Sequence, residues 1–441
     1  MASQETNHEK KSSALDNGGI YDARTLGLPK MGVLGVQHMF AMFGATILVP
    51  ILTGLSPSAT LLWAGFGTLL FHFLTKRMVP AFLGSSFAYL AGYFALTGLA
   101  GTAGYETLTK PVALQYACLG VAASSVIYFI VAAFVKACGV KTVIAFSIWG
   151  RGMFRIIPIL MGVIFSCAAA YLMGKAGWTP AIDYASVANA AWVGLPVHWN
   201  NTVFPILAKP DMGLVVTSLA IIVPLAFATI MEHVGDISAI SSTVNRNYFK
   251  EPGLHRTMLG DGLATCLASL FGAPANTTYG ENTGVLSLSK VYDPRVIRIA
   301  AVLAILVSFC PKFSAFIGTI PGATIGGVSF VLYGMISAVG VRNLVESRVD
   351  LGKSRNMLIV AIILVLTLGI SFSKAGAIKF AVGGVNFALS GLAVGALTGI
   401  LLNAILPGKD FQFSETDPSI KDAERWGGVK PANGADASVA P

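Results

Sequence analysis

The chain has 441 residues, of which 54% are hydrophobic and only 12% are charged, and its mean hydropathy is +0.71. Soluble globular domains carry about 25% charged residues, so this composition excludes an ordinary soluble protein and predicts a polytopic membrane protein. The net charge of +9 comes from basic residues scattered between apolar runs, which favours a role in membrane orientation over nucleic-acid binding.

Twelve apolar segments are candidate membrane spans. They cover residues 31–54, 58–75, 82–99, 113–136, 154–174, 212–232, 258–273, 278–290, 297–311, 318–341, 356–372 and 384–406. With the amino terminus inside the cell, the inner connections hold 18 lysines and arginines and the outer connections hold 6. Because basic residues accumulate on the cytoplasmic side, we expect both termini to be cytoplasmic and the protein to lie in the cell (inner) membrane. The polar ends, 1–28 and 407–441, are expected to be disordered tails.

Two of the segments are interrupted by glycine and small polar residues. One contains Leu83-Gly84-Ser85-Ser86-Phe87, and the other contains Thr278-Tyr279-Gly280-Glu281. Non-helical backbone at membrane depth survives only inside protein or beside a polar cavity, and matching breaks in two halves are typical of inverted-repeat transporters. A carboxylate in such a break is costly. We therefore expect Glu281 to lie at a ligand site; an extramembrane loop that carries a glutamate is the alternative.

A second acidic site is predicted at Glu232 and Asp236, which are four residues apart and would share one face of a helix. Two carboxylates this close and partly desolvated raise the pKa of at least one of them, which is a property that a proton-coupled site needs. The alternative is that residues 232–236 form the hydrated cytoplasmic end of their helix.

Four other ionisable residues lie in or near apolar segments. His38 is interpreted either as a structural histidine bonded to a neighbouring helix or as a ligand contact. His233 points about 100° away from Glu232 on a helix and is expected to pack. His72 is expected at the membrane interface, and Asp261 is expected to cap a helix or to pair with Arg256.

Other chemistries are not indicated. The sequence has no GxxxxGKS/T nucleotide-binding loop, no HExxH motif, no paired-cysteine metal site and no convincing nucleophile–base pair. We therefore expect neither an enzyme nor a bound cofactor or metal. The remaining classes are a transporter, a membrane receptor that only binds its ligand and, less favoured, a channel.

Four stretches carry a family resemblance: Gln37–Thr46, Phe82–Ala88, Glu232–Gly235 and Asn276–Lys290. With them the chain resembles the nucleobase–ascorbate transporter family, closest to its bacterial uracil permeases. The family signature, Gln/Glu/Pro-Asn-x-Gly-x4-Thr-Arg/Lys/Gly, corresponds to residues 281–290, with Ser289 in place of the usual threonine. The resemblance covers roughly residues 30–407.

The resemblance implies an all-α inverted-repeat transporter with a core domain, a gate domain and two broken helices that carry short extended segments. It implies proton symport, with Glu232 and Glu281 binding the base. The proton carriers expected from the spacing of the acidic pair are Asp236 and Glu232. Backbone groups of Phe87 and Gly280 would complete the contacts, and Tyr279 would pack nearby. Four other residues of these stretches are expected to support the site: Gln37, His38, Ser86 and Asn282.

Two departures from the family affect this reading. Position 236 is often histidine in bacterial uracil permeases and is acidic in purine-type members, so Asp236 leaves both strict uracil specificity and the identity of the proton carrier open. Family members have fourteen segments, but here only Cys138–Gly152 fills an interval that holds about two of them. The apolar run Thr142–Trp149 is too short to cross a membrane. We therefore expect about 12 spans, with the loss in the gate domain.

The expected function is a proton-coupled symporter that imports uracil. The alternatives are a xanthine or broader purine/pyrimidine permease, and a relative that binds its substrate but is impaired in transport. The expected domain parts are core residues 29–137 and 212–311, and gate residues 138–211, which are shortened, and 312–406. Expected partners are uracil or a related nucleobase, protons, membrane lipid and, by family precedent, a second copy of the chain; no nucleic acid is expected.

Overall fold

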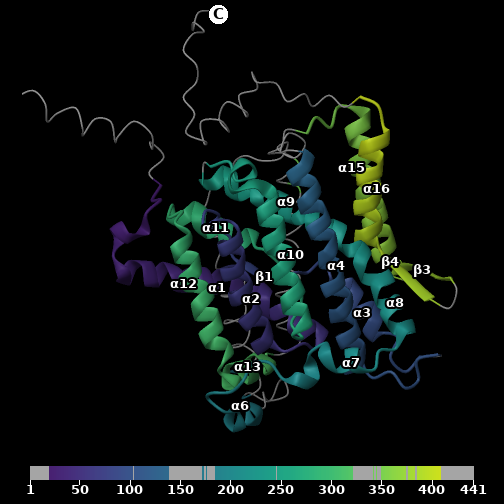
Figure 1. The fold of residues 1–441 in the computed structure, drawn as a ribbon, viewed down its shortest axis with the longest axis horizontal. Coiled ribbons are helices and arrows are strands. Elements are labelled where there is room, and N and C mark those ends of the chain that lie inside the picture. Colours follow the sequence, from purple (N-terminus) through teal and green to yellow (C-terminus); the bar gives the residue numbers. More distant parts are fainter. Residues whose placement is uncertain are drawn as a thin grey trace, which may run out of the picture.

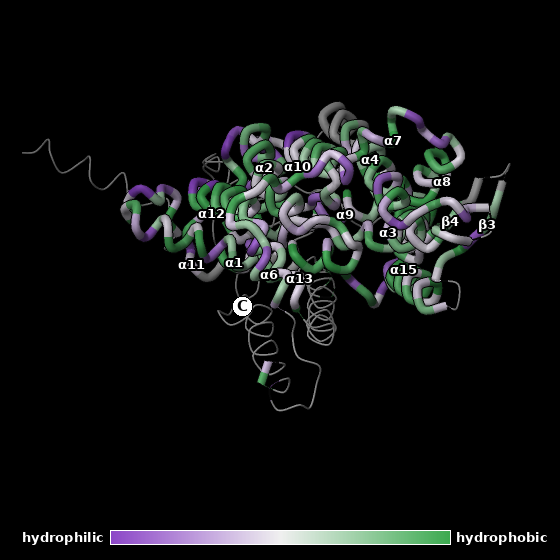
Figure 2. Tube along the Cα trace, turned by 90° about the horizontal axis from the view of Figure 1, so that it is seen from below, coloured by the Kyte–Doolittle hydropathy of each residue, from purple (hydrophilic) through white to green (hydrophobic). Residues whose placement is uncertain are grey.

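The computed structural model describes residues 19–102, 104–138, 171–172, 175, 184–244, 246–320, 341, 344, 349–373, 376–382 and 385–408. Across these residues the chain is mainly helical (Figure 1). Five helical runs are long and apolar enough to cross a membrane: Leu28–Thr53, Pro57–Leu74, Lys110–Phe129, Met212–Ser241 and Ser354–Ser371. Hydrophobic residues line most of the helices, and hydrophilic stretches lie mainly in the connections (Figure 2).

The helices are α1 (Leu28–Thr53), α2 (Pro57–Leu74), α3 (Leu90–Thr97), α4 (Lys110–Cys138), α6 (Ala185–Asn189), α7 (Phe204–Ala208), α8 (Met212–Ile222), α9 (Ala226–Val244), α10 (Leu254–Leu270), α11 (Gly280–Ser289), α12 (Pro294–Ser308), α13 (Pro311–Gly318), α15 (Ser354–Ser371) and α16 (Gly391–Ile405). The strands are β1 (Leu83–Ser85), β2 (Asn276–Thr278), β3 (Ala377–Val382) and β4 (Val385–Ser390). Helices α12 and α13 form a further candidate span that is bent by 85°. The predicted segments 154–174 and 318–341 and the run Thr142–Trp149 lie wholly or almost wholly outside the described residues.

Helix α10 lies at the centre, packed against α2 on one side and α4 on the other, while α12 packs against α1 and α2. Glycines allow this close approach. A Cβ on Gly260 would come within 2.7 Å of the Phe71 ring of α2, and one on Gly262 would come within 2.6 Å of Tyr128 of α4. Small residues let membrane helices pack closely in this way. The residue between these glycines, Asp261, is therefore buried between helices.

Strands β1 and β2 form a two-stranded antiparallel sheet with Leu83 opposite Thr278 and Ser85 opposite Asn276. The sheet is anchored to α2 by two hydrogen bonds. The Leu83 backbone amide donates to the Thr68 hydroxyl (2.9 Å), and the Asn276 side-chain amide donates to the Trp63 carbonyl (3.0 Å). These α2 residues lie about 9 to 17 Å along a helix of about 27 Å. The sheet therefore lies level with the middle of α2, one of the candidate membrane spans. Strand β1 leads into the short helix α3, and β2 leads into the short helix α11.

The part of the chain before α16 differs from the predicted span 384–406. Residues Val385–Ser390 form β4, which pairs with β3 in a hairpin and packs against α8. Branched and aromatic residues favour strands, and Phe387 stacks on Phe380 of β3 with ring centroids 4.9 Å apart. Helix α16 begins only at Gly391, where the Ser390 hydroxyl accepts a hydrogen bond from the Ala393 amide.

The prediction of a disordered tail up to residue 28 is wrong for residues 19–28. Ile20 pairs with Val291 in a β-bridge, and the Tyr21 hydroxyl donates to the Val244 carbonyl at 2.7 Å. The Ala23 amide donates to the Asp293 carboxylate at 2.8 Å. Two backbone contacts and the Tyr21 side chain therefore tie this segment to the end of α9 and to the residues after α11. The rest of the 1–28 tail, and 409–441 of the other, lie outside the described residues.

Candidate functional site

Tyr279, between β2 and α11, fastens the sheet to α1. Its hydroxyl donates to the Ser85 carbonyl (2.9 Å) and accepts from the Thr46 hydroxyl (3.2 Å). Its ring covers Gly84, where a Cβ would lie 2.5 Å from the ring carbons. Tyr279 is buried, so its described contacts are those of a residue that holds the two broken segments together.

The residues after β1 are held by backbone contacts. The Ser86 amide donates to the Ala275 carbonyl at 2.7 Å and extends the ladder beyond β1. The Ser86 hydroxyl accepts a hydrogen bond from the Ala88 amide at 3.3 Å. Phe87 follows half-buried and packs against the main apolar cluster. Because the strands are antiparallel, α3 and α11 leave the sheet in opposite directions.

Helix α9 brings two carboxylates alongside the second break. Asp236 accepts a hydrogen bond from the Thr278 hydroxyl at 2.8 Å, and its other oxygen lies 3.7 Å from the point where a Cβ on Gly280 would stand. Glu232 lies one turn earlier on the same face and is exposed. Both residues lie inside α9, which extends to Val244, so they are not at a helix end as in the alternative interpretation. Asp236 therefore stands at the start of α11, where a helix favours negative charge.

Glu281 is the second residue of α11, directly after Gly280. Glu281 therefore lies in a helix and not in a loop, and the strand before this helix lies level with the middle of α2. The structure therefore gathers the start of α11 and the acidic pair of α9 on one side of β2.

A polar contact runs from this side into the centre of the molecule. The Nδ1 atom of His233 lies 3.3 Å from the Thr278 hydroxyl and 3.7 Å from a carboxylate oxygen of Asp261. His233 and Asp261 are fully buried, and neither oxygen of Asp261 has a hydrogen-bond partner among the residues that the structure describes. The expectation that His233 only packs is therefore wrong, because it lies between a hydroxyl and a carboxylate.

The expected roles of Asp261 as a helix cap or as a partner of Arg256 are wrong as well. Asp261 lies inside α10, and the Arg256 guanidinium donates to the Leu74 carbonyl at 3.1 Å. The physical reason is the close packing of Gly260 and Gly262, which buries the residue between them. This Gly-Asp-Gly sequence within an apolar run is the signal that could have identified Asp261 as an interior carboxylate.

Two further histidines have structural contacts. The Asn282 side-chain amide donates to the His38 carbonyl at 3.0 Å and lies 3.2 Å from His38 Nδ1, which ties α11 to α1. Gln37, the neighbour of His38, is half-buried. His72 is buried, with its Nε2 atom 2.9 Å from the Ala81 carbonyl. His72 lies two residues before the end of α2, so its position near the membrane interface stays a prediction, and the structure adds that protein covers its side chain.

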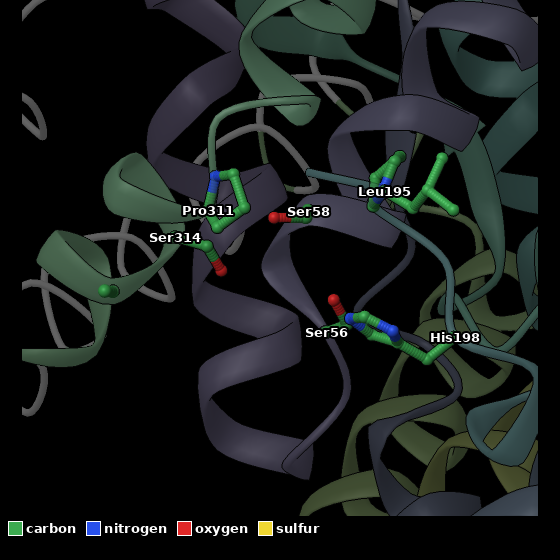
Figure 3. A pocket seen from close by; sticks show the side chains of 8 residues that line it. Ser56, Ser58, Leu195, His198, Pro311 and Ser314 are labelled. Atoms are coloured by element: carbon green, nitrogen blue, oxygen red, sulfur yellow. The ribbon is translucent and has the colours of Figure 1, made fainter. Parts of the chain in front are cut away.

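A cavity of about 220 Å³ opens at the amino-terminal end of α2 (Figure 3). Thr68, which anchors the sheet, lies about 15 Å further along the helix than Ser58 of the cavity wall. Its lining residues come from α2, α13 and the connection before α7: Ser56, Ser58, Leu195, Pro196, His198, Pro311, Ser314 and Ala315. It includes none of the residues predicted from the sequence, so the candidate site is defined by the contacts around β2.

The chain is similar to known permeases along most of its length. It matches the model of the Permease family (Xan_ur_permease) over residues 29–144 and 137–376. It is 37% identical to the uracil permease of Bacillus caldolyticus, with 88% of this chain and 94% of the relative aligned. It is 35% identical to the putative pyrimidine permease RutG of Escherichia coli K12, with 90% and 94% aligned.

Among solved structures, the transmembrane domain of the cyanobacterium bicarbonate transporter BicA matches with a TM-score of 0.51. The match covers 84% of this chain and 97% of that domain at 13% sequence identity, and it shows a shared fold alone.

The sequence alignments also contain gaps in this chain. The alignment with the Bacillus caldolyticus permease extends over 430 residues but takes in only 88% of the chain. About 40 positions of that alignment are therefore gaps in this chain. The family model is matched in two pieces that overlap at residues 137–144. With a family model that matches most of its length and permease relatives above 30% identity, this chain belongs to the Permease family and is a polytopic membrane transporter.

Proposed function

We propose that this protein imports uracil across the cytoplasmic membrane as a proton-coupled symporter. The observation that carries the proposal is the placement of Asp236, with Glu232 one turn away, beside the start of α11 at mid-depth. The names of the relatives, a uracil permease and a pyrimidine permease, support the class of substrate.

Uracil presents two N–H donors and two carbonyl acceptors on a flat ring, and the site residues complement these groups. The carboxylates of Glu232 and Glu281 accept the N–H groups. The backbone N–H group of Gly280, the first residue of α11, donates to one carbonyl oxygen, because the first turn of a helix has donors without helical partners. The family resemblance assigns the second backbone contact to Phe87, which precedes α3 by three residues. Tyr279 supports this arrangement through its hydrogen bond to the Ser85 carbonyl of β1.

The coupling proton is shared by Glu232 and Asp236. Two carboxylates one helical turn apart titrate as a pair and not independently. Asp236 also binds the Thr278 hydroxyl at the end of β2, so a change in its charge acts directly on the strand that leads into α11. Asp261 is a second candidate carrier, because a buried carboxylate without a hydrogen bond is costly as an anion.

Transport occurs by movement of a core domain, residues 29–137 and 212–311, against a gate domain, residues 138–211 and 312–406. The contacts among α1, α2, α4, α10 and α12 support one densely packed core. Helices α15 and α16 pack side by side at the other end of the longest axis from α1 and α12 (Figure 1). No residue of the apolar window of α15 is buried.

We assign twelve crossings to the chain, with both termini cytoplasmic. The gaps of about 40 positions, near two spans of ~20 residues, and the overlap of the family matches at 137–144 support a loss from the first gate part. Single cysteines at positions 140 and 152, in a background without native cysteines, test this topology. Both are expected to react only with membrane-permeant reagents, and labelling of one from outside would contradict the count of twelve.

Uptake of labelled uracil in cells without their own nucleobase permeases tests the function. We expect saturable uptake that unlabelled uracil inhibits more strongly than unlabelled xanthine. Stronger inhibition by xanthine would favour the purine-type alternative, which the acidic residue at position 236 supports. Binding of uracil by the purified protein without uptake would identify a transport-impaired relative, and neither binding nor uptake would refute the proposal.

A further inference from the structure

A basic pocket of about 300 Å³ lies at the opposite end of α2 from the cavity in Figure 3. It is formed by the turn after α2, the residues after α9, the start of α12 and the segment before α1. Eight residues line it, and they include four arginines and one acidic residue. They are Tyr21, Arg77, Met78, Arg246, Asp293, Pro294, Arg295 and Arg298. The site proposed for uracil uses none of these residues.

The acidic groups near the pocket are already engaged. Asp293 binds Arg295 at 2.9 Å and also accepts from the Ala23 amide. Asp22 binds Arg24 at 2.7 Å and Arg295 at 2.9 Å, and the pKa of its carboxyl is held well below its usual range, chiefly by hydrogen bonding to Arg24. Arg295 is thus the arginine that these acids neutralise.

The other three arginines have no carboxylate partner within the described part of the chain. Arg246 lies over the Tyr21 ring, 4.6 Å from its centroid. Arg298 has a buried Nη1 atom without a hydrogen-bond partner among the described residues. Its charged neighbours are Asp293, Arg77 and Arg295. Like charges held together repel each other. An anion in the pocket would relieve this repulsion and satisfy the free guanidinium donors.

The local backbone directs Arg77 into this cluster. Lys76 and Arg77 both have positive φ, 55° and 59°, a conformation that residues other than glycine rarely adopt. Lys76 is directed elsewhere and pairs with Glu251 at 3.3 Å. Adjacent basic residues therefore differ in role: one makes an ordinary surface ion pair, and the other lines the pocket without a partner.

The depth of the pocket indicates the chemistry of its ligand. Arg77 follows the last residue of α2 by three positions, Arg246 follows the last residue of α9 by two, and Arg298 lies in the second turn of α12. Basic groups at the ends of apolar helices lie at the level of lipid head groups, and basic pockets between such helices bind phosphate-bearing head groups. The guanidinium fork also matches the geometry of phosphate oxygens.

We propose that this pocket binds a phosphate group, either the head-group phosphodiester of an anionic phospholipid or a soluble phosphate compound, through Arg77, Arg246 and Arg298. The bound phosphate joins the ends of α2, α9 and α12. It also adjoins the connection from α11 to α12, where the Tyr292 amide donates to the Ile20 carbonyl at 2.8 Å. A phosphate ligand is therefore expected to stabilise the folded protein from the face that we assign to the cytoplasm.

The test uses the purified full-length protein, stripped of lipid in a neutral detergent. Thermal unfolding is followed as a function of added phosphatidylglycerol, phosphatidylcholine, inorganic phosphate or pyrophosphate. The test variants are Arg77→Gln alone and the double variant Arg77→Gln with Arg298→Gln. Lys76→Gln is the control matched to the single variant, since it also removes one positive charge, from the residue next to Arg77. Loss of a charged hydrogen bond weakens binding by about tenfold. We expect at least tenfold weaker binding in the double variant and less than a twofold change in the control.

The two sources of phosphate give different results. Stabilisation by phosphatidylglycerol, but not by inorganic phosphate or pyrophosphate, identifies a lipid head group, and stabilisation by the soluble anions alone identifies a soluble compound. If the double variant does not fold, the single variant Arg77→Gln, which changes an exposed residue, is used for the same binding measurement. The proposed phosphate binding would be refuted if none of these ligands stabilised the protein, or if Lys76→Gln and Arg77→Gln weakened ligand binding equally. Uracil binding is measured in the same samples, so failure here is separable from failure of the proposed transport function.

Discussion

The two broken segments share one architecture and differ in chemistry. In each, a three-residue strand at mid-depth leads into a short helix, α3 after β1 and α11 after β2. Residues 82–99 contain no charged side chain, and Tyr89 and Tyr93 of this segment are buried in an apolar cluster. The second segment is surrounded by polar groups of α1 and α9, including His38 and Asp236.

This difference indicates a division of labour. The first segment supplies a rigid partner strand, and Tyr279 crosses from the second segment to bind the Ser85 carbonyl. The second segment places the start of α11 next to the acidic pair of α9. Changes on the second side should therefore alter transport at nearly constant stability, whereas changes at the contact between the two segments should lower stability first.

The largest effect is expected for Glu281→Gln. The amide places a donor where the base needs an acceptor, and a charged hydrogen bond contributes about 1.5–3 kcal/mol. Uracil binding should weaken at least about tenfold, and uptake should be lost, while membrane insertion stays normal. Binding by the purified variant is compared with that of Glu251→Gln, which removes an exposed carboxylate from the Lys76 ion pair. Unchanged binding in Glu281→Gln would remove this residue from the site.

Asp236→Asn should reduce proton-driven accumulation more than exchange of base for base. The amide still accepts the hydrogen bond from the Thr278 hydroxyl but cannot share a proton with Glu232. Accumulation and exchange are measured in the same vesicles across a range of external pH. If accumulation keeps its normal pH dependence, Asp236 is only structural, and Glu232 and Asp261 remain as candidate carriers.

Gly84→Ala tests the contact between the segments. The added Cβ would overlap the Tyr279 ring, and overpacking of this kind costs about 1–3 kcal/mol. A lower thermal midpoint is expected, with uracil affinity retained in the folded fraction. The matched control is Gly32→Ala in α1, where a Cβ would meet no atom within 4 Å. Equal midpoints for the two variants would show that the ring does not constrain β1.

The smallest effect is expected for Tyr279→Phe. This change removes the hydrogen bonds of the Tyr279 hydroxyl with the Ser85 carbonyl and with the Thr46 hydroxyl, each of which contributes about 1 kcal/mol, and it leaves the ring over Gly84. The thermal midpoint should fall slightly, and uracil binding should change less than in Glu281→Gln. A larger loss of binding than of stability would instead place the Tyr279 hydroxyl in direct contact with the substrate.

Both breaks could be predicted from the sequence, because glycine and small polar residues at membrane depth have a strong local signature. The pairing of Leu83 with Thr278 could not, since it joins segments almost 200 residues apart. Asp261 was misread because its local sequence also fits a helix start. Its burial depends on how α2 and α4 pack against the glycines on either side.

Two other errors have the same origin. The segment around Ile20 is polar and has no periodic pattern, yet it is fixed by partners near residue 291. Strand β4 was predicted as part of a helix because short apolar runs fit either structure, and its pairing with β3 decides between them. Local patterns located the elements and the polar residues, and long-range packing decided their roles.

The most direct test of the central claim is a simultaneous measurement of uracil and proton entry. The purified protein is placed in liposomes that contain a pH-sensitive dye, and labelled uracil is added outside without a pre-set pH gradient. We predict that the interior acidifies as uracil enters and that Glu281→Gln abolishes both signals. Uracil entry without acidification, and unaffected by an imposed pH gradient, would contradict proton symport through this site.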